Sequence, residues 1–345
     1  MPINKITFKK LTSKDYNDFL EICNTSTFAP LLLPNSYSST LWGIIALQDE
    51  IVVGGWVGTL RGNKPIVKFI TKGVWFDSYP IFKFNENIDS LSQNLIAFAK
   101  KQAKKEGITL FNLTHWVRQN IDGSFIDIPE KNATFLIDLR NEEDVLWQNT
   151  RKDFKTKVRK KAINVNIFVA KGEEALQYLN IYQELRYKTQ KKAISNNSKA
   201  SMLLRSDTFF TNIIRNTNSI MFLAKFENKF VVANLMIQSG KVLYPYMSGS
   251  DTALDNQTGA SALLRWEAVK YAKEKGLFYF DLGGVPANPD ENHPAYGVYL
   301  FKKSMGGEYK EFNGGKIIVS PFKYKILSFL LNNRSLLRFI SKNEK

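Results

Sequence analysis

One succession of predicted elements occurs twice along this chain, and it limits the fold more than any other feature of the sequence. Each copy consists of a helix, hairpin strands, a second helix and a closing strand. In the first copy these elements cover residues 15–23, 41–47, 51–60, 64–76, 89–105 and 108–113. In the second copy they cover residues 173–193, 220–226, 230–238, 241–248, 259–275 and 277–282. The repetition predicts a duplicated α/β module.

The junction between the last helix and the last strand supports the duplication residue by residue. AKKEGITLFNL (103–113) aligns with AKEKGLFYFDL (272–282), and a glycine ends the helix in both copies. With 345 residues, the chain has room for two domains of about 150 residues each. We expect domains over residues 1–140 and 141–320, followed by a basic amphipathic tail over 321–345.

The composition excludes several kinds of site. Hydrophobic residues make up 44% of the chain, which is enough for packed cores. The single cysteine, Cys23, rules out an internal disulfide and a cysteine-based zinc site, and it fits a reducing compartment. Two histidines, His115 and His293, rule out a histidine-rich metal site and argue against a Ser-His-Asp triad. The sequence contains neither a signal-peptide core nor about 18 consecutive apolar residues, so we expect a cytoplasmic protein.

The chain is strongly basic. Its 48 Lys and Arg residues against 32 Asp and Glu residues give a net charge of +16, which attracts polyanions and anionic membrane surfaces. Within residues 141–162, Trp147, Phe154, Val158 and Ala162 recur at helical spacing, which predicts one basic helix with a buried stripe. The basic surface of this helix is either solvated or contacts phosphates of RNA or of a nucleotide substrate. Its candidate anion-binding residues are Arg151, Lys155 and Arg159.

The tail over residues 321–345 is also basic and amphipathic. Ile326, Phe329 and Leu330 can share one helical face, with lysines and arginines around it. Two interpretations stay open for this segment. It is either a terminal helix packed back on the first module or an interfacial helix at the inner face of the membrane.

The segment QTGAS at residues 257–261 opens the predicted second helix of the second module. Free backbone N–H groups and the helix dipole favour an anion at such a position. The segment partly resembles the Q/R-x-x-G-x-G/A pyrophosphate loop of GNAT acetyltransferases, although a simple helix cap explains it too. Gln257 and Gly259 are the candidate anion-binding residues here.

The closing strand of the second module ends in a glycine pair. Alternating apolar residues over 278–282 predict the strand, and Gly283 and Gly284 end it. A proline-rich loop follows and leads to Lys302 and Lys303. Chemistry is commonly placed at such strand ends.

Two motifs follow one another in this region: D-x-G-G at the end of the strand, and F-K-x-x-M-G-G after the loop. In this order they resemble the Fem family of aminoacyltransferases, which build peptidoglycan cross-bridges with two tandem GNAT-like domains. The basic run over residues 146–162 resembles the family's entry to the second domain. The resemblance implies a mixed α/β fold of two tandem GNAT-like domains, here without the long coiled-coil arm of some members. The motif residues are Asp281, Gly283, Gly284, Phe301, Lys302, Met305, Gly306 and Gly307.

The resemblance also implies an activity: transfer of an aminoacyl group from aminoacyl-tRNA, as co-substrate, to an amine of a nucleotide- or lipid-linked muropeptide. We expect no metal, no cofactor, no covalent enzyme intermediate and no DNA partner. An amine that attacks an ester passes through a tetrahedral oxyanion, which a fixed cation stabilises. Lys302 matches the family's F-K lysine and is assigned this role, with Tyr246 and Tyr299 as hydrogen-bonding groups near it.

In the family, a T-x-R segment on the first helix of the second domain helps to hold the diphosphate of the acceptor. The nearest match here is T-Q-K, which begins at Thr189 and ends at Lys191. A lysine in place of the arginine loses bidentate reach. We expect Asp281, Gly283 and Gly284 to contribute to the same substrate site.

Two other functions are compatible with the sequence. Residues 25–42 contain no glutamine or lysine where the family has a glutamine-containing F-x-Q-x-x-x-W element followed by an acceptor-binding lysine. The first alternative is therefore a tandem GNAT-type N-acyltransferase that uses acyl-CoA on a cell-envelope or lipid amine. The second is a non-catalytic module that docks on an anionic membrane or on RNA through the basic helix and the tail.

Overall fold

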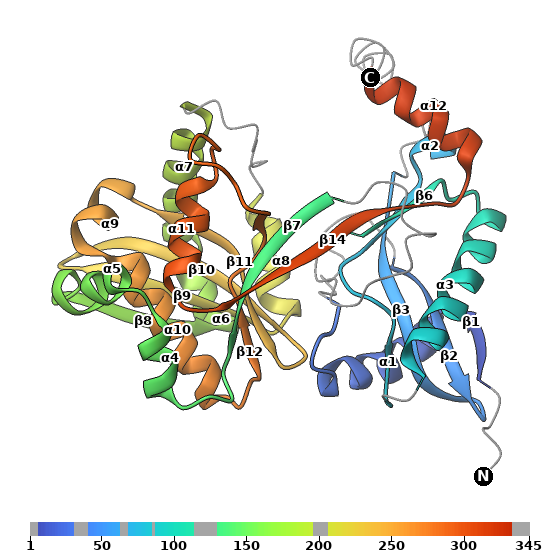
Figure 1. The fold of residues 1–345 in the computed structure, drawn as a ribbon, viewed down its shortest axis with the longest axis horizontal. Helices are drawn as coiled ribbons and strands as arrows, with labels where there is room; N and C mark the ends of the chain where they lie inside the picture. Colours follow the sequence, from blue (N-terminus) through green and yellow to red (C-terminus); the bar gives the residue numbers. More distant parts are fainter. Residues whose placement is uncertain are drawn as a thin grey trace. The chain divides into compact units, whose positions relative to one another are not determined.

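The computed structural model describes residues 6–30, 41–62, 68–84, 87–113, 130–195 and 206–332 (Figure 1). The described chain divides into two compact units. The second unit takes in residues 132–311, and the first unit takes in the described residues before and after that range. The chain returns to the first unit at residue 312, so the strand predicted at 316–320 belongs to the first unit and not to the second.

The first unit contains a mixed sheet in the order β1-β2-β3-β4-β6-β14, in which only β4 and β6 run parallel. A short strand, β5, also pairs with β3. The strands are β1 (Thr7–Lys10), β2 (Leu41–Gln48), β3 (Ile51–Arg61), β4 (Gly73–Phe76), β5 (Ile81–Phe82), β6 (Leu110–Leu113) and β14 (Glu308–Ile318). The helices are α1 (Ser13–Thr25), α2 (Lys68–Thr71), α3 (Ile88–Lys105) and α12 (Pro321–Asn332).

Aromatic side chains fill the core of the first unit. Trp56, Phe76 and Phe111 are fully buried. The Trp56 ring stacks on Phe76 with centroids 3.6 Å apart, and both rings meet Phe111 edge-on. The apolar face of α3 packs into the same cluster, which explains the helical spacing of apolar residues over 89–105.

The described part of the C-terminal tail lies in the first unit. Helix α12 packs against α2, and Lys323 Nζ donates a hydrogen bond to the Gly107 carbonyl oxygen at 3.2 Å. The remainder of the predicted tail, residues 333–345, lies outside the described residues. Among the described helices, none combines the length and the apolarity needed to cross a bilayer.

The second unit contains a sheet in the order β7-β12-β11-β10-β9-β8. Only β11 and β12 run parallel in it, and the short β13 pairs with β7. The strands are β7 (Glu130–Asp138), β8 (Val165–Lys171), β9 (Ser219–Phe226), β10 (Lys229–Ser239), β11 (Val242–Ser250), β12 (Tyr279–Asp281) and β13 (Val285–Pro286). The helices are α4 (Glu143–Asn149), α5 (Lys152–Thr156), the π-helical turn η2 (Lys157–Lys161), α6 (Gly172–Gln177), α7 (Leu179–Ser195), α8 (Asp207–Asn216), α9 (Thr252–Thr258), α10 (Ala260–Glu274) and α11 (Tyr296–Ser304).

The basic helix predicted over 141–162 is wrong as a single element. It breaks at Thr150 and Arg151, whose extended backbone separates α4 from α5. The Arg151 N–H donates to the Ser304 carbonyl oxygen at 2.9 Å, so a contact from α11 replaces a helical hydrogen bond. Just after α11, Gly306 packs on the backbone of Asn149 and Thr150. The predicted buried stripe is nevertheless confirmed. Its residues, buried or partly buried, are Trp147, Phe154, Val158 and Ala162.

Other predicted elements differ in detail. The helix predicted over 173–193 is interrupted at Tyr178, so that α6 and α7 are separate helices. The strand predicted over 64–76 contains the short helix α2 before β4, and its residues 64–67 lie outside the described residues. Helix α9 precedes α10 and was not predicted.

The parallel strands β11 and β12 separate after a short contact. They pair over two residues each, from Val242 and Tyr279 onward. Strand β12 then ends at Asp281, whereas β11 continues to Ser250. A bulge at Tyr246, where β11 is out of register with β10, lies within this continuation. Beyond this point the backbone groups of β11 and β12 no longer pair with each other. The candidate site lies where the two strands separate.

Helix α7 packs directly on β11. A Cβ atom at Gly249 would lie 2.4 Å from the backbone nitrogen of Arg186 and 2.7 Å from the carbonyl carbon of Leu185. Real Cβ atoms do not approach backbone atoms this closely, so only glycine fits here.

Gly249→Ala is expected to lower the free energy of unfolding by about 1–3 kcal/mol, because the added methyl group would clash with backbone atoms of α7, which can move only if the helix shifts. Gly297→Ala is the matched control, since a Cβ atom there meets nothing within 4 Å and alanine favours its helix. Equilibrium unfolding in urea measures both variants. Equal stability of Gly249→Ala and the unchanged protein would contradict the close packing.

Candidate active site

Lys302 lies at the point where β12 ends. Its helix, α11, directs the ammonium group to the glycine pair, where Nζ donates to the carbonyl oxygens of Gly283 at 2.8 Å and Gly284 at 3.1 Å. Gly283 has a φ of +81°, a conformation that favours glycine. The predicted strand end and the predicted F-K lysine are therefore in direct contact.

Asp281 fixes the turn that presents these carbonyl groups. The carboxylate is fully buried and accepts a hydrogen bond from the Gly283 N–H at 2.9 Å. The Thr134 hydroxyl, from β7, lies 2.5 Å from Asp281 Oδ1 and 3.1 Å from the Gly283 carbonyl oxygen. The buried Asp281 carboxylate thus holds the glycine pair in the position where its carbonyl groups meet Lys302.

Arg265 places further positive charge near Lys302, and a second arginine, Arg186, shares its hydrogen-bond partner Ser248 on β11. Arg265 of α10 donates from Nη2 to the Ser248 hydroxyl at 2.9 Å, and Arg186 of α7 donates to the Ser248 carbonyl oxygen at 3.2 Å. The other terminal nitrogen of Arg265, Nη1, is buried and has no hydrogen-bond partner among the described residues. Burial lowers the pKa of the Arg265 guanidinium to about 10.

The same surroundings perturb Lys302. Burial, and then the positive charge of Arg265, lower the pKa of the Lys302 ammonium to about 7, while the negative charge of Asp281 opposes the shift. A titratable group with a strongly shifted pKa at a strand end is typical of active sites. Lys302 can therefore gain or lose a proton near neutral pH.

The two predicted tyrosines lie on the elements that flank Lys302. Tyr299 precedes it on α11, and its ring packs against Phe135 with centroids 5.5 Å apart. Tyr246 occupies the bulge of β11, next to Pro245, whose ring lies 3.9 Å from the Cβ position of Gly283. Tyr246 therefore lies on β11, the parallel neighbour of β12, and Tyr299 packs among aromatic side chains.

Thr189 and Lys191 lie on α7. The Thr189 hydroxyl accepts a hydrogen bond from the Ser250 N–H at 2.8 Å and lies 3.1 Å from the Leu185 carbonyl oxygen. Thr189 therefore fastens α7 to the end of β11, whereas the Lys191 side chain is exposed. Of the two, only Lys191 has an exposed side chain.

A carboxylate of the protein lies beside the anion position predicted at Gln257 and Gly259. The carboxylate of Asp255 accepts hydrogen bonds from the Ser261 N–H at 2.7 Å and from the Ser261 hydroxyl at 2.6 Å. An acidic side chain thus satisfies donors at the start of α10, and anion binding at Gln257 and Gly259 stays a prediction. Gly259, with a φ of +66°, joins α9 to α10, and Gln257 is exposed.

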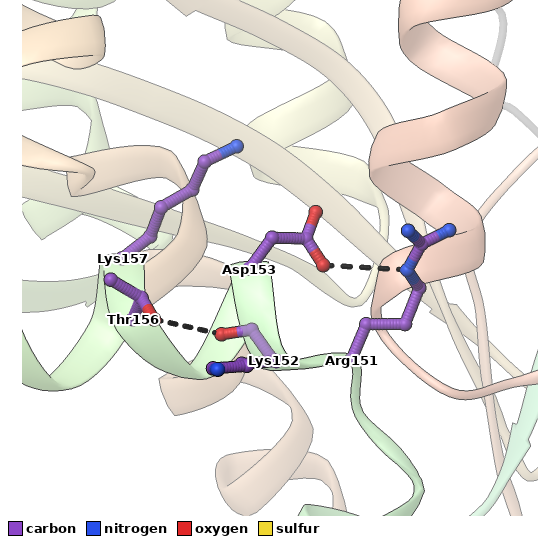
Figure 2. A pocket seen from close by; sticks show the side chains of 5 residues that line it. All are labelled: Arg151, Lys152, Asp153, Thr156 and Lys157. Atoms are coloured by element: carbon purple, nitrogen blue, oxygen red, sulfur yellow. Dashed lines mark hydrogen bonds and ion pairs between the residues drawn. The ribbon is translucent and has the colours of Figure 1, made fainter.

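The three predicted anion-binding residues of the basic segment separate in the structure. Arg151 lines a surface hollow together with Lys152, Asp153, Thr156 and Lys157 (Figure 2). The other two lie elsewhere.

Lys155 donates from Nζ to the Gln148 carbonyl oxygen at 3.0 Å, at the end of α4. The Arg159 guanidinium lies over the Trp147 ring, 4.8 Å from its centroid. Both side chains therefore have partners within the unit, and only Arg151 of the three predicted residues is available at the hollow.

Residues 188–331 match the model of the FemAB family. These residues include the glycine pair, Lys302 and the helix that carries Arg265. This part of the chain is therefore similar to the FemAB family. The predicted relationship to the Fem family is confirmed.

One individual relative agrees with this match. It is 31% identical over 86 residues to lipid II:glycine glycyltransferase of Staphylococcus haemolyticus (strain JCSC1435), a match that covers 24% of this chain and 20% of that protein. The matched part is thus about a fifth of that relative's length.

Solved structures share the fold. The chain is similar to FemX with a TM-score of 0.65 and 15% identity, over 89% of this chain and 96% of that chain. It is also similar to the C-terminal domain of a putative lysylphosphatidylglycerol synthetase from Agrobacterium fabrum, with a TM-score of 0.55 and 10% identity, over 92% of this chain and 97% of that chain. The predicted mixed α/β fold of two tandem GNAT-like domains is confirmed.

Two residues of this candidate site were not predicted from the sequence. Arg265 is a single arginine between the apolar residues Leu264 and Trp266 of α10, and a charge in such a run is a signal that could have found it. Thr134 carries no such signal, because its role depends on the pairing of β7 with β12.

Lys302→Met is expected to stabilise the fold near pH 6 by a few kcal/mol at most, and this gain should shrink as the pH rises. The pKa of Lys302 is about 7 in the folded chain and 10.5 for an ordinary lysine. Between these values the unfolded chain binds more protons, so the stability of the unchanged protein rises with pH. Urea unfolding at a series of pH values measures the difference.

The control for this experiment is Lys303→Met, because Lys303 is exposed and its charged group stays in contact with water. A Lys302→Met variant with the same pH dependence as the unchanged protein would show that the ammonium is not desolvated.

Arg265→Met should raise the pKa of Lys302 above 7, because it removes the positive charge that disfavours a second cation. NMR titration of ε-¹³C-labelled lysine measures this pKa directly. Arg186→Met is the matched control, since Arg186 also bonds to Ser248 but does not contribute to the Lys302 shift. An unchanged Lys302 pKa in Arg265→Met would contradict the electrostatic coupling.

Proposed function

We propose that this protein is an aminoacyltransferase that moves an aminoacyl group from aminoacyl-tRNA to an amine of a peptidoglycan precursor or a similar cell-envelope acceptor. The observation that carries the proposal is the Lys302 ammonium group, held by two carbonyl oxygens where β12 separates from β11. This contact lies within the part of the chain that matches the FemAB family.

The geometry of Lys302 suits a role as oxyanion stabiliser. An ammonium group has three N–H donors, and the carbonyl groups of Gly283 and Gly284 occupy two of them. The third donor is left for a substrate oxygen. Because the first two bonds fix the group, it needs little reorganisation when negative charge develops on the ester carbonyl oxygen.

The reaction needs no group other than its two substrates and the side chains of the site. The acceptor nitrogen forms a bond to the ester carbon, and the carbonyl oxygen becomes an oxyanion beside the Lys302 ammonium. When the tetrahedral intermediate collapses, the bond from carbon to the ribose oxygen breaks. The proton lost by the attacking amine ends on that ribose oxygen, so that atoms and charge balance.

The acceptor is proposed from the relative whose name states it. The Staphylococcus haemolyticus protein is called lipid II:glycine glycyltransferase, which supports a lipid-linked muropeptide as acceptor. We assign Lys191 to its diphosphate and Tyr246 to hydrogen bonding beside Lys302. Such an acceptor would place the protein in the cytoplasm, in peripheral contact with the inner face of the membrane.

The alternative donor, acyl-CoA, has less support. A pyrophosphate at the start of α10 would have to displace the Asp255 carboxylate from the Ser261 N–H and hydroxyl groups. Two anions cannot share these donors without strong repulsion. This observation favours aminoacyl-tRNA over acyl-CoA.

Lys302→Ala is expected to reduce transfer from aminoacyl-tRNA to a UDP-linked or lipid-linked muropeptide by about 10²–10³-fold in kcat, since it removes a fixed donor to the oxyanion. Lys303→Ala is the control, because Lys303 is the neighbouring lysine on α11 and contacts the Tyr299 ring instead. Mass spectrometry of the product measures transfer. A fully active Lys302→Ala variant would exclude the assigned role.

A further inference from the structure

A surface hollow of about 630 Å³ lies along α5 and the start of η2 in the second unit. Figure 2 shows the side chains of Arg151, Asp153 and Lys157 extending from this segment, with the Arg151 guanidinium beside Asp153. Lys152 and Thr156 complete its lining. The hollow is shallow and open to solvent, so it suits an extended ligand better than an enclosed ion.

The backbone beneath the hollow is held rigidly. Thr150 is buried and its hydroxyl donates to the Trp147 carbonyl oxygen at 2.7 Å. The next residue, Arg151, donates its N–H to the Ser304 carbonyl oxygen at 2.9 Å, and the Phe154 side chain is fully buried. The basic side chains therefore project from a fixed frame, which lowers the entropy lost when a ligand binds.

The hollow has an excess of positive charge. Three cations line it against one carboxylate, and that carboxylate, Asp153, lies 3.4 Å from the Arg151 Nε atom. Neither Lys152 nor Lys157 forms an ion pair with a carboxylate of the described residues. A bound anion would compensate this excess, and an arginine beside it can offer two parallel donors.

The hollow is also connected to the helix that carries Lys302. Lys157 Nζ lies 6.0 Å from the centroid of the Phe301 ring, and Phe154 contacts the same ring with centroids 6.3 Å apart. Phe301 immediately precedes Lys302 in α11. The segment that lines the hollow therefore contacts the helix whose next side chain reaches the glycine pair.

We propose that this hollow binds phosphate groups of an RNA strand and holds the 3′ end of the donor so that its ester reaches Lys302. The inference rests on the function proposed above and adds the place where the nucleic acid docks. The open shape favours a strand that passes along the surface. Several cations along an open surface suit phosphodiesters, which carry regularly spaced negative charges.

The test compares two double variants in binding to a short RNA hairpin with a single-stranded 3′ end. Arg151→Gln with Lys157→Gln removes two cations from the hollow. Arg215→Gln with Lys229→Gln is the matched control, because Arg215 pairs with Glu173 as Arg151 pairs with Asp153, and Lys229 is an exposed lysine of the same unit. Both variants lower the net charge equally.

Fluorescence anisotropy at several salt concentrations measures the affinity. The hollow variant is expected to bind RNA about tenfold more weakly, and the slope of log K against log salt should become less steep by about 1.4, roughly 0.7 for each lost phosphate contact. The control variant should retain the affinity and slope of the unchanged protein.

Two outcomes would overturn the assignment of the hollow. The first is equal RNA binding by the hollow variant and the control. The second is loss of binding to UDP or to coenzyme A in the hollow variant, with RNA binding retained, which would assign the hollow to a small nucleotide.

Failure of the proposed function would be seen separately. If the unchanged protein transfers nothing from aminoacyl-RNA to any amine, the proposed activity fails. If the unchanged protein transfers the aminoacyl group but the hollow variant binds RNA with unchanged affinity, only the docking assignment fails.

Discussion

The contact between the Lys302 ammonium and the carbonyl groups of Gly283 and Gly284 is the interaction on which the candidate site depends. It requires β12 to stop at Asp281, because a longer parallel pairing with β11 would leave no room at the strand ends. It also requires a left-handed backbone at Gly283, so that the carbonyl groups turn toward α11. The chemistry of the site is therefore determined by backbone geometry as much as by side-chain identity.

Positive charges outnumber negative charges around this contact. Lys302 and Arg265 lie on two different helices, and the one negative charge that acts on Lys302 is the buried carboxylate of Asp281. Such an arrangement is unfavourable for an isolated protein, because each cation is removed from water without a full partner. It is favourable when a substrate brings negative charge or develops it during reaction. Local instability of this kind is typical of functional sites.

Sequence patterns predicted the site where the signal was local. The glycine pair, Asp281 and Lys302 are close in sequence to one strand end, and the structure brings them together. The break at Thr150 was not predictable, since it depends on a hydrogen bond from Arg151 to Ser304 across the unit. Likewise, periodicity cannot reveal that Asp255 satisfies the start of α10, because the side chain acts through the turn at Gly259. Local periodicity therefore gave the elements, whereas contacts between distant residues decided where they end.

The return of β14 to the first unit has a consequence for how this chain can be divided. Residues 315–318 form an outer partner of β6, so the first unit is assembled from two separate parts of the sequence. A fragment that ends near residue 140 would lack this partner and would expose the backbone groups of β6 as an unpaired edge. The duplicated modules are thus not independent pieces that can be exchanged by a single cut. Recombination of such a chain with a relative would require two crossover points, one on each side of the second unit.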